Sequence, residues 1–523
     1  MSGGSFQIAD LFEALATAMP DRTALVSGAT RLTYAQLDER ADRVAEVLRG
    51  FDVGPGRHVG LHLYNGAEYV EAMLACIKLR AVPINLNYRY VAAELRPLCD
   101  DADLVAIVTE RELLPIVIEA APALPRLVVG DDYEARVAAA SPRRGYGTRS
   151  SDDLYIIYTG GTTGRPKGVM WRQEDMFFAG LQGGRPGGDP VDRPDEVVAH
   201  ASDPDNALRM ITAAPFIHGA AQWGAWIALF SGGTVVIQPG KSFDARRVCE
   251  LIGEERITTI TLVGDAMARP LVDELAAKPY DVSSLFAIAS AGAVLSPSVR
   301  DRLQELVPDA LVLNNFGSTE TGHQGSAFPG SETGADGRPS FAMPEGSLVL
   351  DDEMKPIAAG SGRVGKLARS GRIPLGYYKD AAKTAERFVI VDGVRYVLPG
   401  DLATVEEDGR ITVYGRGSNC INTGGEKVFP EEVEEALKAH PDVFDALVVG
   451  LADDRWMQRV SAVVQLRRGA ARTIDDLQAH CRTLVAGYKV PRQIALVAEV
   501  ARYPSGKPDY AWAKKILEGD ARQ

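Results

Sequence analysis

Short apolar strands alternate with amphipathic helices along the first part of the chain, and this alternation constrains the fold more than any other feature. Thr33, with Gln36 three residues later, predicts the N-terminal cap of the first helix. The expected helix, strand, helix, strand and strand cover residues 32–50, 58–64, 67–79, 104–110 and 126–132. Strands that alternate with helices favour an α/β fold with a largely parallel sheet.

The pattern changes twice further along the chain. After Met343 short strands separated by Gly and Asp predict a small β-rich part, and beyond Gly417 the pattern is α+β, with a helix opened by Pro430. The 523 residues are too many for one hydrophobic core. We therefore expect a large N-terminal domain over residues 1–416, with parallel-rich sheets, helices and the β-rich part. A small α+β C-terminal domain would cover residues 417–523.

Composition narrows the classes of partner. The net charge of −13 argues against nucleic acid as the main partner, because proteins that bind it carry a basic face. No apolar run is long enough to span a bilayer, and the first residues do not resemble a signal peptide. The five cysteines are scattered without metal-ligand spacing, which favours reduced thiols in a cytoplasmic protein.

The stretch "YTGGTTGRPKGV" (158–169) combines glycines, threonines and two cations after a β-prone run. Glycines let backbone N–H groups approach a ligand, and the hydroxyls, Arg165 and Lys167 suit a polyphosphate. The alternative is a plain surface turn. It is not a Walker A loop, because Lys167 lies between Pro166 and Gly168, and Pro166 disfavours a helical Arg165.

This stretch closely resembles the phosphate loop of the adenylate-forming enzymes, which include acyl-CoA synthetases, luciferases and the adenylation domains of peptide synthetases. Gly160 stands where the family commonly has Ser. The resemblance implies that Thr163 is also catalytic. It implies ATP contacts from Thr159, Gly160, Gly161, Thr162, Thr163, Gly164 and Lys167.

Later motifs resemble the same family, in the same order. "NNFGSTETG" (314–322) resembles the segment that holds adenine and Mg²⁺, with Glu320 on the metal and as a catalytic residue. "YVLPGDLA" (396–403) resembles the ribose site. Besides those residues already named, the resemblance assigns the nucleotide to Gly292, Asn315, Phe316, Gly317, Thr319, Asp401, Arg416 and Lys507.

The last motifs imply a mobile C-terminal domain. "YGRGSNCINTGGEK" (414–427) resembles the hinge, here Ser418 where the family often has Asp or Lys, followed by a CoA-binding segment formed by Gly424, Gly425 and Glu426. "YPSGKPDY" (503–510) resembles the motif that places a catalytic lysine, Lys507, in the active site. By this resemblance the domain rotates at Ser418 between adenylation and thioester formation.

The sequence gives less information about which carboxylic acid would be the substrate. "PFIHG" (215–219) resembles the pocket entrance, with His218 as a catalytic residue near the carboxylate; a packed histidine is the alternative. Ile217 stands where amino-acid-activating relatives have Asp, which disfavours an α-amino acid. Small residues that include Ala213, Ala214, Ala221 and Ala266 would leave room for a bulky acid, unless they serve ordinary helix packing. "GVMWRQEDMFF", "GDAMARPLVDEL" and "AGYKVPRQI" look like actinobacterial acyl-CoA synthetases for long-chain acids and steroid side chains.

The resemblance thus implies an acyl-CoA synthetase that uses ATP, Mg²⁺ and CoA on a carboxylic acid. Two alternatives stay open: an enzyme that passes the acyl-adenylate to a carrier protein, and a catalytically silent nucleotide- or acyl-binding protein. A homodimer is common in the family.

Overall fold

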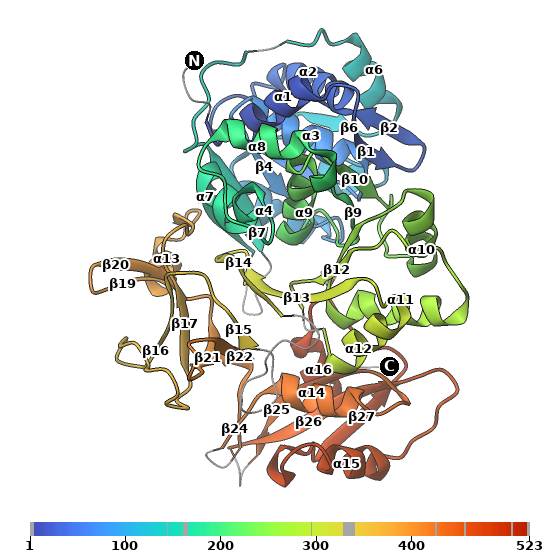
Figure 1. Ribbon diagram of the computed structural model, residues 1–523, viewed down its shortest axis with the longest axis vertical. Helices are drawn as coiled ribbons and strands as arrows, with labels where there is room; N and C mark the ends of the chain where they lie inside the picture. The colour runs from blue at the N-terminus through green and yellow to red at the C-terminus, as the bar shows by residue number, and fades with distance from the viewer. Residues whose placement is uncertain are drawn as a thin grey trace.

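Six parallel strands form the centre of the largest sheet (Figure 1). Its order is β14-β13-β12-β11-β9-β10-β1-β2, and only the edge strands β2 and β14 are antiparallel to their neighbours. The computed structural model describes residues 5–143, 145–159, 166–293, 295–327, 340–423, 426–453, 457–503 and 506–519. The eight strands are β1 (Thr23–Ser27), β2 (Thr30–Thr33), β9 (Arg209–Thr212), β10 (Thr234–Ile237), β11 (Thr259–Leu262), β12 (Ala287–Ser290), β13 (Leu311–Ser318) and β14 (Gly322–Ala327).

Two smaller sheets complete the sheet framework of this part. A four-stranded sheet of order β4-β3-β5-β6 is parallel throughout, and a three-stranded sheet of order β18-β8-β7 is antiparallel. Their strands are β3 (His58–His62), β4 (Val82–Asn85), β5 (Leu104–Thr109), β6 (Arg126–Val128), β7 (Leu154–Thr159), β8 (Lys167–Arg172) and β18 (Gly376–Tyr377).

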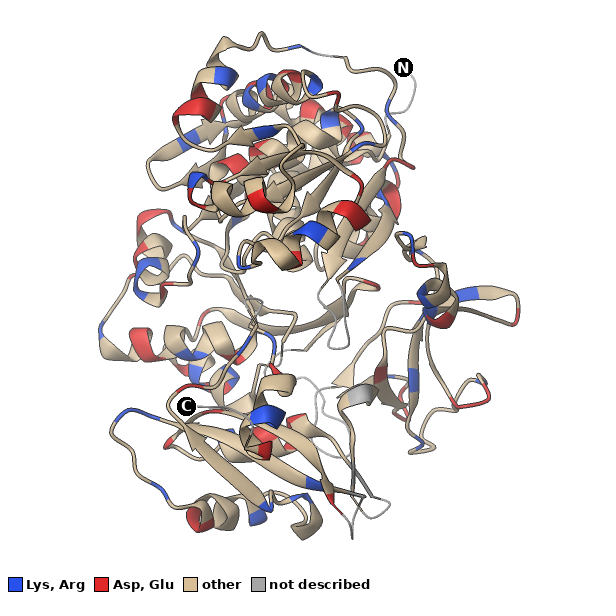
Figure 2. Ribbon diagram, turned by 180° about the vertical axis from the view of Figure 1, so that it is seen from behind, with Lys and Arg blue, Asp and Glu red and all other residues tan. Residues whose placement is uncertain are grey.

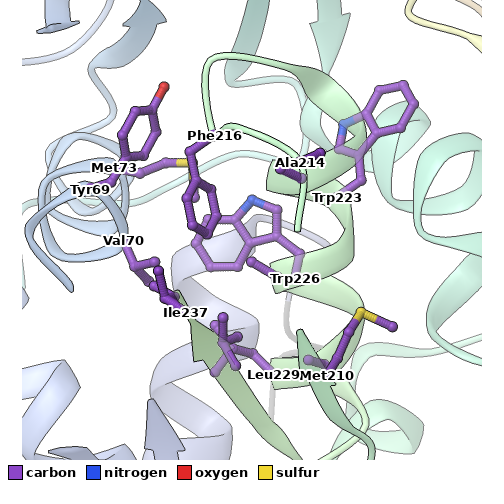
Figure 3. Packing of buried hydrophobic residues seen from close by; sticks show 14 of the residues in the cluster. Tyr69, Val70, Met73, Met210, Ala214, Phe216, Trp223, Trp226, Leu229 and Ile237 are labelled. Atoms are coloured by element: carbon purple, nitrogen blue, oxygen red, sulfur yellow. The ribbon is translucent and has the colours of Figure 1, made fainter. Parts of the chain in front are cut away.

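Helices bury their apolar faces against these sheets. Figure 3 shows Trp226 and Leu229 of one helix, α9, beside Val70 and Ile237, while Trp223 points away from that group. The helices are α1 (Ile8–Ala18), α2 (Tyr34–Arg49), α3 (Ala67–Lys78), α4 (Ala92–Asp101), α5 (Leu114–Ala120), α6 (Asp131–Ala139), α7 (Gln173–Gly180), α8 (Pro194–Ser202), α9 (Gly219–Phe230), α10 (Ala245–Glu254), α11 (Gly264–Ala277) and α12 (Pro297–Leu306).

An antiparallel, β-rich part follows and lies to one side of the large sheet (Figure 1). Its seven strands are paired β15-β22-β21-β17-β20-β19, with β16 on β17. The elements are β15 (Ser340–Phe341), β16 (Ser347–Leu350), β17 (Gly365–Arg369), α13 (Ala381–Arg387), β19 (Phe388–Val391), β20 (Val394–Val397), β21 (Asp401–Val405) and β22 (Ile411–Arg416).

The last part of the chain has a sheet and a core of its own. The chain leaves the seven-stranded sheet at Arg416 and enters a five-stranded sheet at Ile421, across the short 3₁₀ turn Gly417–Asn419. This part lies beneath α11 and α12 in Figure 1. Its elements are β23 (Ile421–Thr423), β24 (Glu426–Val428), α14 (Pro430–Lys438), β25 (Val443–Asp453), β26 (Met457–Leu466), α15 (Ile474–Arg482), β27 (Gln493–Val497) and α16 (Tyr510–Glu518).

The predicted fold class is confirmed, with one local correction. Thr33 and Gln36 form both hydrogen bonds of the capping box at the start of α2. The predicted strand over residues 126–132 is too long, because β6 ends at Val128 and α6 begins at Asp131. Gly130, with φ of +111°, breaks the strand, and acidic residues in the first turn favour the helix that follows.

Two further features are the distribution of charged residues and the apolar character of the helices. Basic and acidic residues are interspersed along the ribbon in Figure 2. In the part of the chain that the structure describes, no helix has the length and apolar character needed to cross a bilayer.

Candidate functional site

The glycine-rich stretch connects two strands of a hairpin. β7 ends at Thr159, β8 begins at Lys167, and these two residues lie opposite each other in the register. A strand rather than a helix follows the stretch, as Pro166 predicts. Gly160, Gly161, Thr162, Thr163 and Gly164 lie outside the described residues.

Lys167 is held at the base of this hairpin. Its Nζ lies 3.0 Å from Oδ2 of Asp380 and 5.6 Å from the centre of the Tyr377 ring. Both partners come from the segment around β18, which pairs with β8. The ammonium therefore stays beside the stretch that would receive phosphate.

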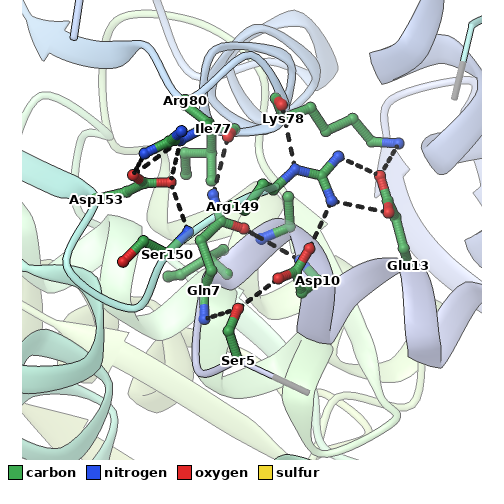
Figure 4. Close-up of polar contacts among 12 residues, drawn as sticks. Ser5, Gln7, Asp10, Glu13, Ile77, Lys78, Arg80, Arg149, Ser150 and Asp153 are labelled. Atoms are coloured by element: carbon green, nitrogen blue, oxygen red, sulfur yellow. Dashed lines mark hydrogen bonds and ion pairs between the residues drawn. The ribbon is translucent and has the colours of Figure 1, made fainter. Parts of the chain in front are cut away.

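A buried ionic cluster anchors the segment that leads into β7 (Figure 4). Arg149 donates to Asp10 at 2.7 Å and to Glu13 at 2.8 Å, and the Lys78 ammonium lies 3.0 Å from Glu13. Lys78 is fully buried and also contacts Asp38 at 2.7 Å and Asp42 at 2.6 Å. We call these six residues the anchor network: Asp10, Glu13, Asp38, Asp42, Lys78 and Arg149.

Most of the predicted adenine segment lies on β13, beside the edge strand β14 of the large sheet. The half-buried ring of Phe316 lies 5.4 Å from that of Phe341, and Ser326 donates to Oδ1 of Asn315 at 2.6 Å. Gly317 sits where β13 and β14 shift register, and a Cβ atom there would lie 2.2 Å from the carbonyl oxygen of Gly322. Only glycine fits this close approach.

Thr319 and Glu320 follow β13 and are fixed by residues that the sequence did not single out. Trp171 Nε1 donates to the Thr319 carbonyl at 2.9 Å, and the Tyr377 hydroxyl donates to Oε1 of Glu320 at 3.2 Å. Tyr377 also lies under the Lys167 ammonium, so one ring connects the expected phosphate and metal contacts. No short-range pattern marks it, because it is 57 residues from Glu320.

The environment of Glu320 fits a Mg²⁺ ion held mainly by its substrate. No group of three or more His, Cys, Asp or Glu residues gathers at a metal-binding spacing within the described chain. Mg²⁺ typically takes one or two carboxylates and completes its shell with phosphate oxygens and water. One half-buried carboxylate is enough for that arrangement.

Asp401 and the hinge meet on adjacent strands. Asp401 begins β21, is 8% exposed, and lies opposite Arg416 of β22 in the register. Ser418 belongs to the 3₁₀ turn that follows, and Glu426 begins β24. Gly424 and Gly425 lie outside the described residues, as do the side-chain positions of Arg416, Ser418 and Glu426.

His218 occupies the N-cap position of α9, where its side chain makes no capping hydrogen bond, and its imidazole is neutral. Burial, followed by the charges of Lys507 and Arg89, lowers the pKa of His218 to about 3. Its Nε2 atom is buried and has no hydrogen-bond partner among the residues described. Asn85 fixes the preceding turn, since its Nδ2 donates to the Ile217 carbonyl at 2.6 Å and to the Tyr158 carbonyl at 2.8 Å. The imidazole is thus a polar group available to a ligand.

Lys507 belongs to a tight turn of the C-terminal part. The amide of Gly506 donates to the Tyr503 carbonyl at 2.8 Å, and the amide of Tyr503 donates to the Lys507 carbonyl at 2.9 Å. Gly506 has φ of +73°, and a Cβ atom there would lie 3.0 Å from Cγ1 of Val263, just before α11. The turn from the C-terminal part is therefore seated against the N-terminal part.

A cavity of about 740 Å³ lies between the two parts, beside this turn. It falls within the usual size range of small-molecule sites, roughly 300–1,000 Å³. Its walls include Tyr88, Ala213, Pro215 and Ala266 from the N-terminal part and Gly506 and Trp512 from the C-terminal part.

The small residues proposed as pocket walls divide into two groups. Ala213 and Ala266 line the cavity, whereas Ala214 and Ala221 are fully buried in the core. Gly292 follows β12 in an exposed position with φ of +78°. The packing alternative therefore holds for part of the set.

Comparison with protein-family models matches two segments of the chain. Residues 12–378 match the AMP-binding enzyme family, and residues 432–507 match the AMP-binding enzyme C-terminal domain.

Curated relatives match nearly the full length. The chain is 46% identical to a 3-oxocholest-4-en-26-oate–CoA ligase of Rhodococcus rhodochrous, over 98% of this chain and 96% of the relative. It is 45% identical to a medium/long-chain-fatty-acid–CoA/3-oxocholest-4-en-26-oate–CoA ligase of Mycolicibacterium smegmatis, over 98% and 97%. It is 41% identical to the medium-chain acyl-CoA ligase Mig of Mycobacterium avium, over 98% of both chains.

Solved structures share the fold. The anthranilate CoA ligase AuaEII, in complex with anthranoyl-AMP, superposes with a TM-score of 0.85 at 23% identity, over 98% of this chain and 97% of that one.

Proposed function

Because the chain belongs to the AMP-binding enzyme family, we propose that it is an ATP-dependent, AMP-forming acyl-CoA ligase. The observation that carries the proposal is the contact of the Lys507 turn, at Gly506 of the C-terminal part, with Val263 of the N-terminal part. The turn borders the cavity that Pro215 and Ala266 also line. The family motifs at Lys167, Glu320, Asp401 and Arg416 are expected to bind ATP around that point.

We propose a steroid side-chain acid or a long-chain fatty acid as the substrate. The names of the full-length relatives support this class, since they specify a cholestenoate or medium- and long-chain acids. The cavity of about 740 Å³ beside Pro215 and Gly506 is the space that we assign to the approach of the acid and the thiol.

In the first half-reaction a carboxylate oxygen attacks the α-phosphorus of ATP. The bond from that phosphorus to the bridging oxygen breaks, pyrophosphate leaves, and an acyl-adenylate remains. Two anions must meet, so cationic side chains have to stabilise the negative charge that builds up. Lys507 and Lys167 supply that charge. The neutral His218 offers a hydrogen-bonding group to the acid without adding charge.

Glu320, whose carboxylate is oriented by the Tyr377 hydroxyl, would hold Mg²⁺. When bound, Mg²⁺ supplies Lewis-acid stabilisation to phosphate oxygens.

In the second half-reaction the CoA thiol attacks the acyl carbon, a thioester forms, and AMP leaves. We propose that the C-terminal domain rotates at Ser418, withdraws Lys507 and brings in Gly424, Gly425 and Glu426. Such gating by domain motion is common among enzymes with two half-reactions.

We place the protein in the cytoplasm. All five cysteines lie in the described part of the chain, where none forms a disulfide and four are buried, as suits a reducing compartment. A homodimer stays a prediction, which sedimentation of the purified chain would test.

Pyrophosphate release from ATP and Mg²⁺ tests the function directly. The acids would be acetate, benzoate, octanoate, palmitate and a steroid with a carboxylated side chain, each with and without CoA, beside Lys507→Ala. We expect release with the larger acids, loss of release in Lys507→Ala, and acyl-CoA only when CoA is present.

The other outcomes separate the alternatives. Adenylation without CoA-dependent turnover would favour an enzyme that loads a carrier protein. ATP binding without pyrophosphate release for any acid would contradict the ligase and favour a silent binding protein.

A further inference from the structure

The turn that carries Lys507 is held by a buried arginine. Arg502 donates from Nε to Oδ2 of Asp445 at 2.6 Å and from Nη2 to Oδ1 of Asp445 at 2.7 Å. The two side chains are only 14% and 9% exposed. Such a bidentate pair has a fixed geometry, so β25, which carries Asp445, defines the orientation of the guanidinium.

The third contact of Arg502 reaches the turn itself. Nη1 donates to the carbonyl oxygen of Gly506 at 3.1 Å, one residue before Lys507. Val263 of the N-terminal domain lies close to the same glycine. The turn therefore has two contacts at Gly506, a charged donor of its own domain and an apolar side chain of the other domain.

A second buried ion pair crosses the boundary between the two domains. Lys438 Nζ, on α14, lies 3.1 Å from Oδ2 of Asp265, on α11, and the side chains are 3% and 2% exposed. Asp265 also accepts from the Ser296 amide at 2.8 Å and from Arg269 at 3.3 Å. Burial alone would raise the pKa of Asp265, but Lys438 and Arg269 outweigh it and lower that pKa to about 2.

The two ion pairs belong to one electrostatic cluster. Burial would lower the pKa of Lys438, but Asp265, Glu434 and Asp445 raise it, and Arg502 acts on it as well. Glu434 is itself fixed, because its Oε1 accepts from the Val448 amide at 2.9 Å. We call these five residues the bridge network: Asp265, Glu434, Lys438, Asp445 and Arg502.

Stability alone does not account for this arrangement. Buried ion pairs often stabilise a protein no more than apolar residues of the same volume would, because both charges lose their hydration. A connected set of charges does, however, favour one relative arrangement of the elements that carry it. Here those elements are α11 of the N-terminal domain and, in the C-terminal domain, α14 and the Arg502–Asp445 pair that supports the Lys507 turn. We call the Arg502–Asp445 pair the frame of this turn.

We propose that Arg502 and Asp445 are positioning residues for Lys507, and that Lys438 and Asp265 dock this frame onto the N-terminal domain for adenylation. The inference rests on the proposed function, in which Lys507 acts in the first half-reaction only. Arg502, which lines the cavity together with Asp445, acts on Lys507 through its hydrogen bond to the Gly506 carbonyl.

The test compares the two half-reactions in Arg502→Gln and Asp445→Asn. Pyrophosphate release measures adenylation, and thioester formation from synthetic acyl-adenylate and CoA measures the second step. We expect adenylation to fall by ~100-fold, because a misplacement of about 1 Å can cost that much, and thioester formation to stay near the wild-type rate. Loss of both half-reactions in equal measure would overturn the proposal.

A double-variant cycle separates positioning from a general structural role. If Arg502 acts through Lys507, Arg502→Gln should reduce adenylation no further in a Lys507→Ala background. A further loss there would contradict the proposal, and so would wild-type adenylation in Arg502→Gln alone. Thermal melting identifies a variant that fails to fold, and Asp445→Asn, which leaves the arginine in place, then carries the same test.

The chain offers a matched control, an arginine that pairs with the same helix, α11, at an exposed position. Arg467 pairs with Asp273 of α11 at 3.0 Å, also across the domain boundary, but the side chains are 37% and 46% exposed. Arg467→Gln should leave both half-reactions unchanged. If the wild-type protein releases no pyrophosphate with any acid, the proposed function fails; if it does and Arg502→Gln matches it, only the positioning role fails.

Discussion

The anchor network and the bridge network use the same chemistry in two places, one inside the N-terminal domain and one at the boundary between the domains. Each buries a lysine among carboxylates and places an arginine in a multidentate contact. The anchor network joins α1, α2, α3 and the segment before β7 within one domain, whereas the bridge network joins two domains. A buried ion pair within one domain can be broken only by unfolding, so it contributes to stability. A buried ion pair between two domains can also be broken by domain separation, so it can favour one arrangement of the domains.

The largest effect is expected at the centre of the anchor network. Lys78→Met leaves Asp38, Asp42 and Glu13 without their shared cation, and breaking a buried pair in this way costs about 3–5 kcal/mol. The free energy of unfolding, measured in urea, should fall by that amount. Turnover per folded molecule should not change. A variant with full stability and reduced turnover would contradict the purely structural role of the anchor network.

A smaller effect, of a different kind, is expected at the domain boundary. Lys438→Met removes the cation that docks α14 on Asp265, but the domains can part and hydrate that carboxylate without unfolding. We expect adenylation to fall roughly tenfold, with a smaller loss of unfolding free energy than in Lys78→Met. Both quantities would be measured on the same preparations, and the reverse order would contradict the assignment of the two networks.

Acid should weaken the bridge network. The pKa of Asp265 is about 2 in the folded protein against an ordinary value of 3.8, so its contribution is complete above pH 3.8 and is lost as pH falls towards 2. That difference corresponds to about 2 kcal/mol. The slope of unfolding free energy against pH between these values should be lower in Asp265→Asn. An unchanged slope would show that Asp265 is not held in its charged form.

The smallest effect is expected at His218. Because the pKa of His218 is lowered to about 3, its imidazole stays neutral around its ordinary pKa of 6.5. The pH profile of adenylation should therefore lack a histidine limb near 6.5. His218→Asn should lower the rate without changing the shape of that profile. A limb that disappears in the variant would mean that His218 is more hydrated than its burial indicates.

Local pattern was sufficient for much of the fold. The capping box at Thr33 and the absence of a helix after Pro166 both depend on neighbouring residues. Local propensity and steric restriction are therefore enough to predict them. The β-rich part was predicted for the same reason, because Gly and Asp turns are local signals; the structure adds that its strands are antiparallel. The end of β6 was missed, since a run of apolar residues does not show where pairing with β5 stops.

The candidate site likewise contains residues that local motifs identify and residues that only distant pairings bring together. Glycines, Lys167, Glu320 and Lys507 belong to contiguous motifs, so the sequence named them. Tyr377 and Trp171 were not named, because they meet Glu320 and Thr319 through pairings between distant strands. Arg502 stands beside a recognised motif, but only its contacts with Asp445 and Gly506 distinguish it from a surface cation.

The sequence by itself determined the order of elements, the two-part organisation and the residue types of the expected chemistry, because those depend on periodicity, turn residues and contiguous motifs. Only the tertiary structure decided which distant charges became partners. Asp265 and Lys438 are ordinary surface residue types, and their pairing depends on how two separately packed cores meet. The physical reason is that burial, which sets the strength of an ion pair, belongs to the assembled fold and to no single segment.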